Sequence, residues 1–91
     1  PTLIDYGQIN SSTKTFQNLG SYDEVLIVFG IDGDGSSPTV SFTGASSELL
    51  SSGIIRIFYR VVLIYKLSNL TNNVVATISS FNLTSCFFVL T

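Results

Sequence analysis

The sequence predicts an all-β protein, a small antiparallel β-sandwich, and three observations favour this class. The 91 residues suffice for one domain with a single modest core. Six or seven short segments rich in Ile, Val, Phe and Tyr follow one another at intervals of roughly 8 to 14 residues, separated by clusters of Gly, Ser and Asn. No segment has a helical pattern long enough for the crossover that a parallel sheet requires. We therefore expect one domain that spans residues 1–91.

The N-terminal part contains the two weakest of these segments, Thr2–Tyr6 and Thr13–Gln17. The stretch GQINSS between them has the composition of a flexible connection. We expect residues 1–12 to form a strand and its connection, and residues 13–91 to form the body of the sandwich.

Two strands are expected next. The run Tyr22–Ile31 (YDEVLIVFGI) is rich in β-formers, and its middle part, Val25–Phe29, is apolar on both faces. The run Pro38–Thr43 (PTVSFT) alternates, which places Val40 and Phe42 on the core side.

The stretch GIIRIFYRVVLIYKL, Gly53–Leu67, is as apolar as a membrane segment. A helix that spans a bilayer needs about 20 predominantly apolar residues, and the arginines leave only short runs here, so we expect no membrane span. Its Ile, Val, Tyr and Phe residues favour one long or bent strand with alternate residues from Ile55 to Tyr65 on the core face. The other face then carries Arg56, Phe58, Arg60, Val62, Ile64 and Lys66.

The C-terminal part predicts two more strands. Asn73–Ser79 places Val74, Ala76 and Ile78 on one face, and Leu83–Leu90 is apolar on both faces. Cys86 is the only cysteine, so no disulfide can form within the chain, and we expect it to be a small core residue. Before these strands, only SSELLSS has room for a helical turn, inside a turn-like cluster.

The chain has more apolar residues than a small sandwich can bury. Hydrophobic residues make up 45% of the chain and charged residues 11%, against about 25% charged in ordinary domains. In a sandwich, each strand should bury one face and expose the other to water, yet several strands here are apolar on both faces. This surplus predicts burial against other copies of the chain.

Composition also excludes several functions. A net charge of −2 with only four Lys and Arg residues argues against nucleic acid as a partner. Without His, neither a Ser-His nor a Cys-His pair can form, and zinc lacks its usual ligands. We expect no enzymatic activity and no cofactor.

Two kinds of surface site can be proposed from local motifs. The stretch IDGDGSS has oxygen-bearing residues at every other position, as calcium loops do, at Asp32, Asp34 and Ser36. An acidic hairpin turn explains the same residues, because a further bidentate acid is missing nearby. Three N-glycosylation sequons begin at Asn10, Asn69 and Asn82.

The order of the segments YDEVLIVFG, DGDGSSPTVSFTG, IRIFYRVV, VVATIS and CFFVLT resembles immunoglobulin-like β-sandwich domains. Such domains occur in phage and viral structural proteins and in extracellular adhesins and filament subunits. The likeness covers roughly residues 21–91. After Gly44 the chain departs from the pattern, since the usual Trp-containing strand is absent.

The resemblance implies a sandwich that lacks one edge strand, and a neighbouring subunit can complete such a sheet by donating a strand. The candidate donor is TLIDY near the N-terminus. The residues expected at contacts between copies are Thr2, Leu3, Ile4, Asp5, Tyr6, Phe58, Val62 and Ile64.

The expected function is that of a structural subunit in an extracellular, pilus-like filament or a virion surface assembly. Its expected partners are copies of itself and other virion or filament proteins. The alternative is a carbohydrate- or receptor-binding module of an adhesin or viral tail fibre, whose partners would be cell-surface glycans.

Overall fold

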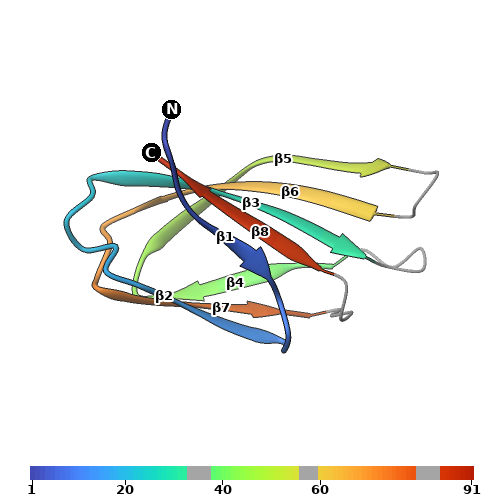
Figure 1. The fold of residues 1–91 in the computed structure, drawn as a ribbon, viewed down its shortest axis with the longest axis horizontal. Coiled ribbons are helices and arrows are strands. Elements are labelled where there is room, and N and C mark those ends of the chain that lie inside the picture. Colours follow the sequence, from blue (N-terminus) through green and yellow to red (C-terminus); the bar gives the residue numbers. More distant parts are fainter. Residues whose placement is uncertain (33–37, 56–59, 80–84) are drawn as a thin grey trace.

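The computed structural model describes residues 1–32, 38–55, 60–79 and 85–91. Two antiparallel sheets pack face to face (Figure 1), with strand orders β1-β8-β3-β6-β5 and β2-β7-β4. The expected all-β antiparallel sandwich is therefore confirmed. Eight strands lie in the described residues, one or two more than expected: β1 (Leu3–Gln8), β2 (Thr13–Gln17), β3 (Glu24–Asp32), β4 (Val40–Thr43), β5 (Ser46–Ile55), β6 (Arg60–Ser68), β7 (Asn73–Ile78) and β8 (Cys86–Leu90).

The first half of the chain pairs with the second half in reverse order. β1 pairs with β8, β2 with β7 and β3 with β6, and β4 leads into β5 through Gly44 and Ala45. This long hairpin is rolled up, which also makes neighbours of β3 and β8, of β4 and β7, and of β5 and β6. A rolled, eight-stranded double sheet of this kind is a jelly roll.

The strand order differs from the immunoglobulin order that the resemblance implies. In immunoglobulin domains, strands A and B, D and E, and F and G are sequence neighbours that share a sheet. Among the described strands here, only β5 and β6 are sequence neighbours in one sheet. The resemblance rests on the succession of strands along the chain, whereas the order within each sheet depends on pairings between distant segments.

β5 corrects two expectations. Most of the stretch GASSELLSSG, Gly44–Gly53, expected as a turn-like cluster, belongs to the edge strand β5, which pairs with β6. Gly53–Leu67 is not one strand, because β5 and β6 are antiparallel and Ile55 pairs with Arg60. Residues 56–59, among them Arg56 and Phe58, lie outside the described residues. Their sequence, RIFY, contains none of the residues that mark turns, so the reversal had no local signal.

The expected donor segment belongs to β1 and pairs with β8 of the same chain. Thr2 and Thr91 exchange two backbone hydrogen bonds of 2.9 Å, which places the two termini side by side (Figure 1). The register shifts between Leu3 and Asp5, and Ile4 packs partly buried against the core.

The core lies between the two sheets. The expected inward positions are confirmed for Val40, Phe42 and the alternate residues of β7. Five aromatic rings cross the core in edge-on or tilted pairs with centroids 5.1–6.5 Å apart: Phe16, Phe29, Phe42, Tyr65 and Phe87. Cys86 is not a core residue. It pairs with Gly30 and lies half-buried on the outer side of β8, because Phe87 and Val89 take the inward positions.

Candidate functional site

The outer side of the five-stranded sheet shows three rows of side chains aligned across the strands. The strand registers place Leu3, Leu90, Leu26, Lys66 and Glu48 in one row. The middle row contains Tyr6, Phe88, Val28, Ile64 and Ser51. The third row contains Gln8, Cys86, Gly30, Val62 and Gly53. We call eight of these residues the apolar face: Leu3, Tyr6, Leu26, Val28, Val62, Ile64, Phe88 and Leu90.

The residues of the apolar face alternate with the core residues along each strand, so they point away from the other sheet. The other sheet therefore does not cover them. Tyr6, Leu3 and Phe88 are 68%, 47% and 42% exposed. The other five are half-buried. Val62 and Ile64, expected on a second apolar surface, lie in this face together with Leu3 and Tyr6. Phe58 is outside the described residues.

The three-stranded sheet provides an internal comparison. Its outward residues are Thr13, Thr15, Gln17, Ser41, Thr43, Asn73, Val75 and Thr77. Only one of these is apolar, as expected for the wet face of a sandwich. The outer surface of the three-stranded sheet is thus polar, whereas that of the five-stranded sheet is apolar over four strands.

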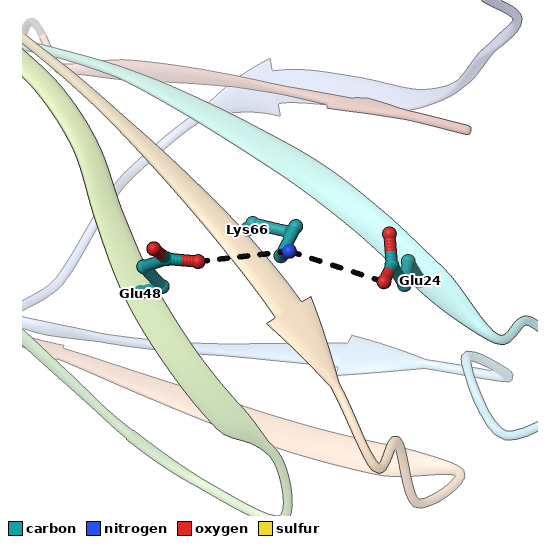
Figure 2. A network of polar contacts seen from close by, with 3 residues as sticks. All are labelled: Glu24, Glu48 and Lys66. Atoms are coloured by element: carbon teal, nitrogen blue, oxygen red, sulfur yellow. Dashed lines mark ion pairs between the residues drawn. The ribbon is translucent and has the colours of Figure 1, made fainter.

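Charged residues border the apolar face at one end. The Lys66 ammonium lies 3.6 Å from a Glu48 carboxylate oxygen and 4.0 Å from one of Glu24, which links β5, β6 and β3 (Figure 2). All three side chains are more than a third exposed, so each pair contributes at most about 1 kcal/mol to stability. Beside them, a depression of about 230 Å³ reaches Leu26 and Leu90. An apolar centre with a polar rim is the usual composition of a protein interface.

A second feature lies between β1 and β2, which are edge strands of different sheets. A groove of about 510 Å³ opens there, lined by Ile4, Asp5, Lys14, Thr15, Gln17, Asn18, Leu19 and Tyr22. The Lys14 ammonium lies 4.9 Å from the centre of the Phe87 ring and 5.8 Å from that of Phe16, within cation–π range. Sequence reasoning missed this groove, because only the tertiary fold makes residues of β1 and of the β2 region line one space.

The remaining predicted site residues are scattered. Asp34, Ser36 and the side chain of Asp32 fall outside the described residues. In the part that is described, no group of three or more His, Cys, Asp or Glu residues could hold a metal ion. Asn10 and Asn69 are exposed, and the Asn69 amide donates a hydrogen bond of 3.0 Å to the Ser46 hydroxyl. Asn82 is also outside the described residues, and glycosylation stays a prediction at all three sequons.

No helix among the described residues has the length and apolar character needed to cross a membrane.

The chain matches no family model, no curated protein and no solved structure. The functional inference therefore rests on the apolar face and the polar groove.

Proposed function

We propose that this protein is a structural subunit that self-associates through its apolar face, within an extracellular filament or a virion surface assembly. The contrast between the two outer surfaces carries the proposal. One is almost wholly polar, whereas the other presents eight apolar side chains in register on β1, β8, β3 and β6. Contiguous apolar patches of this kind mark interaction surfaces.

A second copy of the chain can cover the face. The molecule measures 37 × 24 × 20 Å, and a standard protein interface buries about 800 Å² on each partner, which is of the order of one broad side of a molecule of this size. The eight residues of the apolar face are uncharged, and Lys66 at its border is paired with Glu48 and Glu24, so two copies can stack sheet on sheet around a twofold axis without burying an unpaired charge.

The free energy gained by burying the apolar face is large enough to offset the cost of association. Full burial of a large apolar side chain is worth about 1.5–3 kcal/mol, so a half-buried one retains about 1 kcal/mol to gain. The apolar face has eight residues, each with at least about this much to gain, on each of two copies. Together they supply on the order of 10–20 kcal/mol, against an association cost of about 4–15 kcal/mol.

The location is proposed from composition and architecture. Jelly rolls occur in viral capsid and lectin domains, which is an analogy at the level of fold. Exposed sequons at Asn10 and Asn69 and a surface rich in Ser, Thr and Asn are compatible with an extracellular or virion environment.

Sedimentation equilibrium and negative-stain microscopy of the purified chain test self-association. We expect dimers or regular polymers that form as the protein concentration rises. A chain that stays monomeric at about 1 mM would have an association free energy weaker than about 4 kcal/mol, which contradicts the proposal.

We also propose that β1 can be exchanged between copies. β1 is an edge strand with one pairing partner, and within it only Ile4 packs against the core. Exchange would keep the pairing with β8 and link neighbouring subunits.

A disulfide distinguishes exchange from pairing within one chain. Leu3 and Leu90 are register partners, so the variant Leu3→Cys/Leu90→Cys/Cys86→Ser should form a disulfide between β1 and β8. Exchange predicts covalently linked multimers on non-reducing gels of the assembled protein. Disulfides formed only within single chains would show that β1 is not exchanged.

A further inference from the structure

The groove between β1 and β2 has two walls of different origin. Ile4 and Asp5 of β1 form one wall, and Lys14 of β2 with the β2–β3 connection, including Tyr22, forms the other. No described strand bridges the two, because β1 and β2 are both edge strands. The result is an open space rather than an enclosed cavity.

Local backbone features hold the second wall in place. Asn18 has a φ of 63°, a left-handed conformation that Asn tolerates better than most residues. A Cβ at Gly20 would meet the Oδ1 end of the exposed Asn72 side chain, so a larger residue there would require that side chain to shift. The Tyr22 amide donates a hydrogen bond of 3.1 Å to the Leu19 carbonyl, which closes the turn.

The lining is polar and its charges balance. Lys14 supplies one positive charge and Asp5 one negative charge. The Lys14 ammonium is held over the Phe87 ring, and an Asp5 carboxylate oxygen accepts a hydrogen bond of 2.9 Å from the Tyr6 amide. In the described part of the chain, no hydrogen bond engages the side chains of Gln17, Asn18 or Tyr22.

We propose that this groove binds a neutral oligosaccharide. The partly exposed Tyr22 ring offers a flat apolar surface for one face of a sugar ring. The amides of Gln17 and Asn18 can each donate to and accept from sugar hydroxyls, and the Asp5 carboxylate accepts. Asp5 disfavours an anionic ligand, and a polar lining disfavours a purely apolar one. The volume lies within the 300–1,000 Å³ that is usual for ligand sites.

The groove residues are distinct from the apolar face, so binding does not depend on self-association through that face. If β1 is exchanged, a neighbouring copy supplies Ile4 and Asp5, and the groove keeps the same lining. Isothermal titration calorimetry of the full chain with chitotriose, cellotriose and maltotriose tests the proposal. At least one of these neutral trisaccharides should bind. Tyr22→Ala and Gln17→Ala should each weaken that binding by about tenfold or more, through lost ring packing and lost hydrogen bonds.

Tyr6→Ala is the matched control, since Tyr6 is also an exposed tyrosine but lies on the apolar face. This variant should bind the trisaccharide as the unmodified chain does. Absence of heat with all three sugars would overturn the proposal, as would unchanged binding by both Tyr22→Ala and Gln17→Ala variants with unchanged melting temperatures. Either result leaves the sedimentation experiment on self-association unaffected.

Discussion

Replacing Val28 by Thr tests the apolar face at its centre. Val28 is half-buried and pairs with Ile64 on one side and Phe88 on the other. Thr has nearly the same shape and the same branching at Cβ, so the fold of the single chain should be retained. The substitution adds one hydroxyl that water can reach only while the face is free.

The magnitude follows from what the hydroxyl meets. Between two apolar faces it has no hydrogen-bond partner, and burying it costs about 1–3 kcal/mol. A twofold contact buries it once in each copy, so the association free energy should weaken by about 2–6 kcal/mol. This corresponds to about 30-fold to 10⁴-fold in the dissociation constant.

Sedimentation equilibrium over a range of concentrations measures this shift, and Val75→Thr is its control. Val75 is also half-buried, but it lies on the outer side of the three-stranded sheet between Thr15 and Thr43. Val75→Thr should leave the dissociation constant unchanged. The reasoning is refuted if Val28→Thr changes it by less than about twofold, or if both variants weaken association equally.

Two further predictions concern stability, measured by chemical denaturation of the monomeric species. Phe87→Ala should lower the free energy of unfolding by about 3–5 kcal/mol, because this residue is 2% exposed and its ring centroid lies 5.1 Å from that of Phe16. Phe88→Ala should lower it by less than about 1.5 kcal/mol, because Phe88 is exposed on the outer side of the sheet. Equal costs would contradict the assigned faces of β8. Gly44→Ala should cost more than about 1 kcal/mol, because Gly44 has a φ of 89° and a Cβ there would clash with the Asn73 carbonyl. Gly53→Ala, in open space, should change stability by less than about 1 kcal/mol, and a similar loss at both glycines would refute this account.

Alternation predicted the core wherever a strand keeps one face buried. In β7 the inward residues Val74, Ala76 and Ile78 follow directly from the period of two, because each strand must turn its apolar side to the other sheet. The runs Val25–Phe29 and Cys86–Leu90 also predicted an apolar outer surface. In runs that are apolar throughout, however, the pattern cannot say which face is inward, and Cys86 was assigned to the wrong one.

The chain reversal between β5 and β6 and the strand character of residues 46–55 could not be predicted locally. Ser-rich β5 has little intrinsic preference for a strand, and it forms one because β6 offers unpaired backbone groups along its length. The polar groove could not be predicted from the sequence for a similar reason. Asp5 and Tyr22 line it from segments that are separate in the sequence, and only the tertiary fold places them around one space.

The sequence by itself determined that this protein is all-β, that its core is built from alternating strands, and that it has more apolar side chains than one sandwich buries. These properties depend on residue types and on a period of two, which strands keep wherever they lie except at a bulge such as those in β1 and β5. Only the tertiary structure decided the jelly-roll order, the gathering of surplus apolar residues on one sheet, and the groove between edge strands of the two sheets. Those depend on hydrogen bonds between strands far apart in the chain, whose partners are selected by the packing of the whole domain.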